Sequence, residues 1–169
     1  SWRWLTPLAV CMLAILAYSQ VYADKQNQRA HDERWEWDGQ VIGNLLGIAF
    51  KHQAPLLAVD PAGCLPYFSK LPSLDMLGLN DRFIAHHRSQ DFGHGLLGHE
   101  LGDADYVLRR EPDLIVFCGP HGDRNGCFRS SRGLAKSAEF HARYRLIRFY
   151  GSEPYPYRSL IWVRTNSQR

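Results

Sequence analysis

Hydrophobic residues form one long, unbroken run near the start of the chain. No residue between Trp4 and Ala23 is charged, and Asp24 and Lys25 follow at once. At about 1.5 Å per residue in a helix, such a run spans roughly the 30 Å of hydrocarbon in a bilayer. The pattern therefore predicts a transmembrane helix within residues 1–23. Its flanks carry the aromatic residues typical of membrane interfaces, namely Trp2, Trp4, Tyr18 and Tyr22.

Two other interpretations fit the same apolar run. A secretory signal peptide would use Arg3 as its basic segment and would be cleaved after Ala23. A buried helix of a globular protein is usually shorter and carries polar residues along one stripe. The charges on the two flanks do not fix the orientation of a membrane helix. Because the chain begins at Ser1, without an initiator methionine, we expect it to be part of a longer protein.

Beyond the run, residues 24–34 are polar and charged, and they either continue the membrane helix outward or form a linker to the domain. Helical stripes then alternate with short apolar segments. The apolar segments have the length and the bounding turn residues of strands that are buried on both faces. In chain order, the predicted elements are a helix over 35–50, a strand over 56–59, a helix over 64–70, a strand over 73–77, a helix over 104–110, a strand over 114–118, a helix over 131–142, and strands over 144–150 and 159–164.

This alternation predicts one small layered α/β domain over residues 35–169, with a mostly parallel sheet and an antiparallel edge at its C-terminus. The stretch is long enough for one domain with its own core and too short for two. The net charge of +3 is small and the basic residues are scattered, so nucleic acid is not an expected partner. No dinucleotide fingerprint follows the first strand and no G-x-S-x-G elbow occurs, so we predict no cofactor and no serine hydrolase.

The carboxyl ends of parallel strands are where open α/β sheets place ligand sites. Asp60 ends the first predicted strand, and a turn at Gly63 opens the next helix. Asp60 can therefore hold a ligand hydroxyl or a metal ion, or it can cap that helix. The loop after the strand over 114–118 reaches the same edge and brings His121 with it.

The second strand leads into the densest group of polar residues. Asp75 ends the strand, and Asn80 and Asp81 follow within its loop, where they can shape a turn or cap the helix that begins at Arg82. Gly78 lies between them, and we expect it to need a backbone angle that other residues avoid.

Histidines follow this loop in quick succession. His86, His87, His94 and His99 invite a metal hypothesis. However, none of them form an i,i+4 pair supported by a carboxylate, which is the arrangement of helical zinc motifs, and adjacent histidines on a helix point apart. The sequence therefore predicts no metal site, and the Gly-His segments favour a flexible loop near a ligand.

Cys118 and Cys127 bracket a short loop that is rich in glycine. In an oxidising compartment the pair can form a disulfide, and the alternative is two buried free thiols. A structural zinc site is not expected, because the chain lacks C-x2-C pairs.

The segment VDPAGCLPYFSKLPSLDMLGLNDRFIAHH, the Gly-His loop after it and the strand after Pro112-Asp113 form an ordered series of motifs. This series, within Pro55 to Phe117, resembles the C-terminal extracytoplasmic domain of bacterial integral-membrane glycosyltransferases. The group in question is the arabinofuranosyltransferase-like family of the GT-C superfamily, which has a membrane helix just before this domain. The motif positions here are Asp60, Gly63, Asp75, Gly78, Leu79 and Asp81.

The resemblance implies a transferase that uses a polyprenyl-phosphate sugar to modify a cell-envelope glycan, with this domain outside the cytoplasmic (inner) membrane. Its catalytic carboxylate would lie in an early loop that this chain lacks, so no catalytic residue is assigned. This part would bind the glycan acceptor or cover the active site. The alternative is a membrane-tethered extracytoplasmic binding domain without catalytic activity. The residues expected to contact substrate are Asp60, Gly63, Asp75, Asn80, Asp81, His86, His99 and His121.

Overall fold

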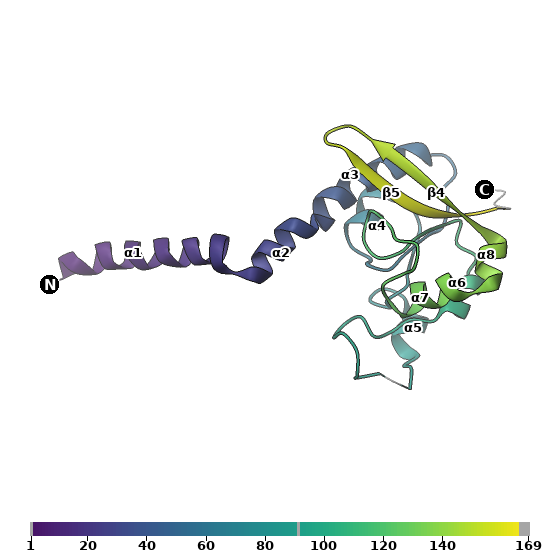
Figure 1. The fold of residues 1–169 in the computed structure, drawn as a ribbon, viewed down its shortest axis with the longest axis horizontal. Coiled ribbons are helices and arrows are strands. Elements are labelled where there is room, and N and C mark those ends of the chain that lie inside the picture. The colour runs from purple at the N-terminus through teal and green to yellow at the C-terminus, as the bar shows by residue number, and fades with distance from the viewer. Residues whose placement is uncertain (1, 91, 166–169) are drawn as a thin grey trace. The chain divides into compact units, whose positions relative to one another are not determined.

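The computed structural model describes residues 2–90 and 92–165, and the chain falls into two compact units that divide between Arg34 and Trp35. Figure 1 shows the ribbon of both units. The first unit is helical, and its stretch Leu5–Ala23 is long and apolar enough to cross a membrane, with none of it buried by the protein. A signal sequence would satisfy the same criteria of length and composition, so this helix is a candidate span. The unit consists of η1 (Trp2–Trp4), α1 (Leu5–Tyr18), η2 (Ser19–Ala23) and α2 (Lys25–Glu33).

The polar segment after the apolar stretch begins a new helix rather than an open linker. The Asp24 side chain accepts hydrogen bonds from the backbone N–H groups of Gln26 (2.8 Å) and Asn27 (3.1 Å). Those two groups would otherwise have no partner in the first turn of α2. The sequence change from apolar to charged residues therefore coincides with a capped helix start.

The second unit is a mixed α/β domain built on one five-stranded sheet. Its elements run along the chain as α3 (Trp35–Ala49), β1 (Leu57–Val59), α4 (Cys64–Ser69), β2 (Ser73–Asp75), α5 (Arg82–His86), α6 (Ala104–Arg109), β3 (Leu114–Val116), α7 (Arg129–Lys136), α8 (Ala138–Arg143), β4 (Tyr144–Gly151) and β5 (Tyr157–Arg164).

The sheet is mixed, so the expectation of a mostly parallel sheet is wrong. Its strand order is β2-β1-β3-β5-β4. β1 pairs in parallel with β2 and β3, whereas β5 runs antiparallel to both β3 and β4. The connection between β4 and β5 spans only residues 152–156, which suits an antiparallel hairpin and is too short for a parallel crossover. This hairpin extends the sheet from β3, so the sheet has two parallel and two antiparallel strand pairings.

The strands β1 and β3 are buried along their whole length, and helices cover both faces of the sheet there. Successive strand residues point to opposite faces, so Leu57 and Val59 face one layer and Ala58 faces the other. The first layer is α3 and α4, which contribute Ile42, Leu46 and Leu65. The second layer is α6, α7 and α8, which contribute Val107, Leu108, Leu134 and Phe140. The domain therefore has three layers, and its wholly apolar strands follow from burial on both sides.

The helix predicted over 131–142 is divided into α7 and α8. Ser137 has extended backbone angles and accepts a hydrogen bond from the Phe140 N–H at 3.2 Å, so it caps α8. Serine competes for local backbone groups in this way, which makes it a poor residue inside a helix. The apolar positions Leu134 and Phe140 nevertheless face the same core.

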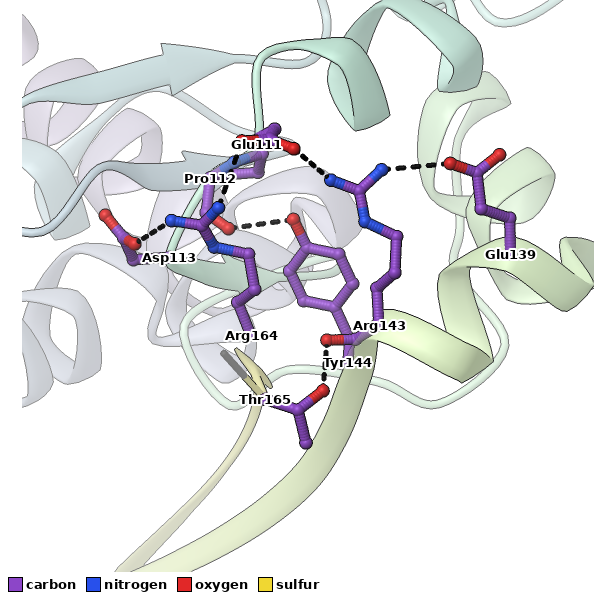
Figure 2. A network of polar contacts seen from close by, with 8 residues as sticks. All are labelled: Glu111, Pro112, Asp113, Glu139, Arg143, Tyr144, Arg164 and Thr165. Atoms are coloured by element: carbon purple, nitrogen blue, oxygen red, sulfur yellow. Dashed lines mark hydrogen bonds and ion pairs between the residues drawn. The ribbon is translucent and has the colours of Figure 1, made fainter. Parts of the chain in front are cut away.

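A polar network fastens the end of the hairpin to the start of β3 (Figure 2). The Arg164 guanidinium donates to the buried Asp113 carboxylate at 2.7 Å and to Glu111 at 3.2 Å. The other carboxylate oxygen of Asp113 accepts the Leu56 N–H at 2.9 Å. Tyr144 donates to the Pro112 carbonyl oxygen at 2.8 Å, and burial raises the pKa of this phenol to about 12. The network lies at the amino end of β3, opposite the edge that carries the candidate site.

Candidate functional site

Asp60 lies just beyond β1, where the sequence predicts a ligand site, and it is fully buried (0% exposed). Its Oδ2 accepts a hydrogen bond from the Cys118 N–H at 2.8 Å, which links the carboxyl ends of β1 and β3. Its Oδ1 has no hydrogen-bond partner among the described residues. Burial, with a smaller contribution from the charge of Asp75, raises the pKa of Asp60 to about 6.

The alternative that Asp60 caps the next helix is wrong. The N-cap of α4 is Gly63, which has no side chain to offer, and Asp60 instead bonds across the sheet edge to Cys118. The Ser131 hydroxyl in α7 lies close enough to lower the pKa of Asp60, but that hydroxyl donates its own hydrogen bond to the Phe128 carbonyl oxygen at 3.3 Å.

Asp75 organises the loop that follows β2. It is 4% exposed, and its carboxylate accepts the N–H groups of Leu77 (2.9 Å), Gly78 (3.2 Å) and Asn80 (2.6 Å). Gly78 has a positive φ of 82°, which confirms the expectation of an unusual backbone angle. A Cβ at this glycine would lie 2.8 Å from the Ile84 side chain, so both the angle and the space require glycine. Asn80 joins this loop through its backbone N–H.

Asp81 fixes the next helix and joins it to α6. Its side chain accepts the Ile84 N–H at 3.0 Å, so it caps α5 as the sequence allows. Its second oxygen accepts the Tyr106 hydroxyl at 3.0 Å, and that hydroxyl accepts a hydrogen bond from Arg110 at 2.6 Å. The Phe83 ring stacks on Tyr106 with a centroid distance of 4.2 Å. The loop after β2 is therefore anchored at both ends.

The start of α7 packs against the same edge. The Ser130 hydroxyl is fully buried, donates to the Met76 carbonyl oxygen at 2.9 Å and accepts the Asp103 N–H at 2.9 Å. Gly102 lies against it, and a Cβ there would be 2.6 Å from the Ser130 hydroxyl oxygen. Three chain segments far apart in the sequence thus converge at the carboxyl ends of β1 and β2. The carboxylates of Asp60 and Asp75 are buried in this scaffold, and the scaffold holds the neighbouring surface in place.

A cavity of about 310 Å³, lined by both polar and apolar residues, opens beside the start of α7, and we call it the α7 cavity. His99, one of the predicted site residues, lines it and stacks on the Phe128 ring at a centroid distance of 4.9 Å. Arg129 is held by a hydrogen bond of 3.1 Å to the Glu100 carbonyl oxygen. Positive charge outweighs negative in this cavity, which suits a ligand with hydroxyl or anionic oxygens. Its charged and titratable lining residues are His94, His99, Glu100, Arg129 and Arg132.

Gly63 lines a different, smaller cavity of about 90 Å³ at the ends of β1 and β3. Its walls are mostly apolar and include Trp35, Pro61 and Pro120. The half-buried Cys64 beside it donates its thiol to the Trp35 carbonyl oxygen at 2.9 Å. Burial raises the pKa of this thiol, which keeps it in the unreactive protonated form.

His121 lies apart from the other predicted site residues and pairs with Asp38 of α3. Its Nε2 lies 2.6 Å from a carboxylate oxygen of the buried Asp38, and its Nδ1 lies 2.7 Å from the Arg158 carbonyl oxygen. Tyr155 donates to the other oxygen of Asp38 at 2.6 Å. Both ring nitrogens therefore face hydrogen-bond acceptors. His86 is exposed at the end of α5 and does not join either group.

The structure joins Cys118 and Cys127 in a disulfide with a Cα–Cα distance of 5.4 Å, one of the two alternatives that the sequence leaves open. The bridge closes the loop that follows β3. Among residues 2–90 and 92–165, no cluster of three or more His, Cys, Asp or Glu side chains is arranged to hold a metal ion.

The sequence did not indicate Asp38, Tyr106 or Ser130, although each fixes a predicted site residue or the scaffold around it. Their partners lie 25 to 83 residues away in the chain, so no local pattern could reveal them. Ser130 lies in the first turn of α7, where serine is common, but this position does not reveal its contact with Met76.

Comparison with known proteins gives one match. The family model described as Domain of unknown function (DUF8728) matches residues 21–165, which is most of the chain. No curated protein and no solved structure matches it.

Proposed function

This chain belongs to the DUF8728 family, and we propose that it is the membrane-anchored part of a glycosyltransferase that takes its sugar from a polyprenyl phosphate. In this proposal Leu5–Ala23 spans the cytoplasmic membrane, and the α/β domain lies on the extracytoplasmic side. The domain binds the glycan acceptor or covers the membrane-embedded active site, while the catalytic carboxylate belongs to another part of the full protein.

The observation that carries the proposal is the convergence of the residues on which the resemblance rests. Four of the six motif positions, Asp60, Asp75, Gly78 and Asp81, belong to one scaffold at the carboxyl edge of the sheet, whereas Gly63 lines another cavity and Leu79 is exposed. A chance match of motifs along a sequence would have no reason to converge in this way. Ligand sites of open α/β sheets lie at such an edge.

Two further features support the proposed location. The Cys118–Cys127 disulfide suits an oxidising compartment, since thiols in the cytoplasm are normally kept reduced. The candidate span of 19 residues is close to the length that a helix needs to cross the hydrocarbon core of a bilayer.

The α7 cavity is the place in this domain where a glycan would bind. Its volume of about 310 Å³ lies at the small end of the range for ligand pockets, enough for one or two sugar rings. Arg129, Arg132 and the two histidines offer hydrogen-bond donors to sugar hydroxyl oxygens, and the Phe128 ring offers a face on which a sugar can lie.

A transfer assay tests the proposal. Membranes from cells that express the complete reading frame are mixed with a donor and an acceptor. The donor is polyprenylphosphoryl-arabinofuranose with a radiolabelled sugar, and the acceptor is an oligosaccharide that contains arabinofuranose. Labelled product is expected, and Arg132→Ala should raise the KM for the acceptor while kcat changes less. Arg109→Ala is the matched control, because Arg109 is exposed at the end of α6, outside the lining of the α7 cavity. An absence of transfer with every polyprenyl-phosphate sugar supplied would overturn the proposal.

A second candidate is a membrane-tethered binding domain without a transferase. It is favoured by the burial of Asp60 and Asp75, whose carboxylates serve the scaffold rather than an open reaction site. The coding sequence upstream separates the two candidates. Further membrane helices with an acidic first loop would support the transferase, and an initiator methionine just before Ser1 would support the tethered domain.

A further inference from the structure

Three arginines line a cavity of about 290 Å³ between the β4–β5 hairpin and the disulfide loop, a cavity separate from the α7 cavity. We call it the arginine cavity. Its side-chain lining comes from Asp123, Arg124, Asn125, Arg148, Tyr150 and Arg158.

The hairpin presents two of these arginines on one face. Arg148 pairs with Leu160 across the antiparallel ladder, and Tyr150 pairs with Arg158. Side chains alternate between faces, so all four residues point to the same side of the hairpin. Arg148 and Arg158 are then diagonal neighbours with backbones roughly 7–8 Å apart, a separation that two long side chains can bridge onto one ligand.

The disulfide loop is held firmly against this face. The Leu160 N–H donates to the His121 carbonyl oxygen at 2.8 Å, and the Ser159 hydroxyl donates to the Pro120 carbonyl oxygen at 2.8 Å. Gly122 has a φ of 68° and approaches β5 so closely that a Cβ would overlap the Leu160 carbonyl oxygen. The loop therefore cannot move away from the hairpin without breaking these contacts.

Arg124 is carried on a turn that is itself fixed. The Asp123 carboxylate accepts the N–H groups of Asn125 (2.6 Å) and Gly126 (3.1 Å). The Cys118–Cys127 bond closes the loop around this turn. A fixed turn reduces the entropy that Arg124 loses when it binds a ligand.

The three arginines have no carboxylate partner in the described part of the chain. Elsewhere in the domain, Arg110, Arg143 and Arg164 do form ion pairs with carboxylates. Asp123 is the one acidic residue in the cavity lining, and its Oδ1 accepts two backbone N–H groups, so the cavity sets three positive charges against one negative charge. Positive charges gathered in this way repel one another, and a bound anion would relieve that repulsion.

We propose that the arginine cavity binds an acidic saccharide, in which the arginines hold a phosphate or carboxylate group and Tyr150 lies against the sugar ring. Guanidinium groups match both oxyanions with pairs of parallel hydrogen bonds. The Tyr150 ring is 70% exposed at the rim and so is available to a ligand. This proposal does not depend on the transferase, because the arginine cavity shares no residue with the α7 cavity.

The test is calorimetric titration of the whole chain in detergent micelles with glucose 1-phosphate, glucuronic acid, glucose and inorganic phosphate. We expect both acidic sugars to bind, more weakly at high salt, and neutral glucose to bind far less. Arg148→Ala and Arg158→Ala should each weaken binding of the acidic sugars about tenfold or more, since a charge-assisted hydrogen bond contributes roughly that factor.

The matched control is Arg145→Ala, on the same strand but facing the other side of the hairpin, where it does not line the cavity. Tyr150→Ala should weaken binding of both acidic sugars and leave binding of inorganic phosphate unchanged. Arg148→Lys keeps the positive charge and replaces the alanine variant in the test if that variant does not fold. Its affinity for the acidic sugars should lie between those of wild type and Arg148→Ala.

The proposal is overturned if neither acidic sugar binds, or if Arg145→Ala reduces binding as much as Arg148→Ala. Equal affinity for inorganic phosphate and glucose 1-phosphate, with no effect of Tyr150→Ala on either, would overturn the assignment of the sugar to Tyr150. The transfer assay does not measure any of these outcomes, so the two proposals can fail separately.

Discussion

Asp60 should make the domain less stable as the pH rises through the mildly acidic range. The side chain is fully buried, and one of its carboxyl oxygens has no hydrogen-bond partner among the described residues. In the ionised form that oxygen would carry negative charge without compensation, whereas the protonated form avoids this cost. Asp60→Asn keeps the shape and an oxygen to accept the Cys118 N–H, but it cannot ionise.

The size of the effect follows from the pKa. Burial raises the pKa of Asp60 from 3.8 to about 6 in the folded state. Between these two values the folded protein holds a proton that the unfolded chain has released, so the free energy of unfolding falls as the pH rises. The full loss is about 3 kcal/mol, reached above pH ~6, because each unit of pKa corresponds to about 1.4 kcal/mol.

Urea unfolding of the whole chain in detergent micelles measures this directly. Tryptophan fluorescence reports the transition, because Trp162 is buried in the core of the domain. Relative to wild type, Asp60→Asn should gain about 2 kcal/mol between pH ~4 and pH ~7, because pH ~4 already lies just above the unfolded pKa of 3.8. Asp105→Asn, at an exposed position in α6, controls for the general effect of removing a carboxylate. A constant difference between wild type and Asp60→Asn across this pH range would refute the reasoning.

Three further predictions concern stability. Gly78→Val should lower the free energy of unfolding by roughly 1–3 kcal/mol in the same urea assay, because valine disfavours a positive φ. Thiol labelling of the unreduced, denatured chain should modify two of its four cysteines, and replacing Cys118 and Cys127 by serine should cost about 2–3 kcal/mol. Asp113→Ala should cost roughly 3–5 kcal/mol, since it leaves a guanidinium and a backbone N–H without their acceptor. Glu139 forms an exposed ion pair in the same network (Figure 2), so Glu139→Ala should lower the free energy of unfolding by under about 1 kcal/mol.

Features set by neighbouring residues could be predicted from the sequence. The helix over 35–50 and the short apolar strands follow from periodicity and burial, and α3, β1 and β3 lie within those ranges. The role of Asp75 could also be predicted, because its backbone partners are two to five residues away. Asp and Asn next to glycine commonly make such local hydrogen bonds.

Features that depend on distant partners could not be predicted. The place of β5 between β3 and β4 depends on contacts between residues about fifty positions apart. The sequence of a short apolar strand does not indicate which strand will pair with it. His121 shows the same limit at the level of one side chain. Its partner Asp38 is 83 residues away, so the sequence indicated a position at the sheet edge but not the pairing with α3.

The disulfide loop connects the surfaces of this domain that could hold a ligand. Cys118 and Pro120 border the apolar cavity, Asp123 to Asn125 border the arginine cavity, and Cys127 borders the α7 cavity. The loop contributes little apolar surface of its own, so its conformation depends on the covalent bond and on its hydrogen bonds to β5. If the proposed ligands bind at these surfaces, a loop that is already held in place loses less entropy when a site is filled.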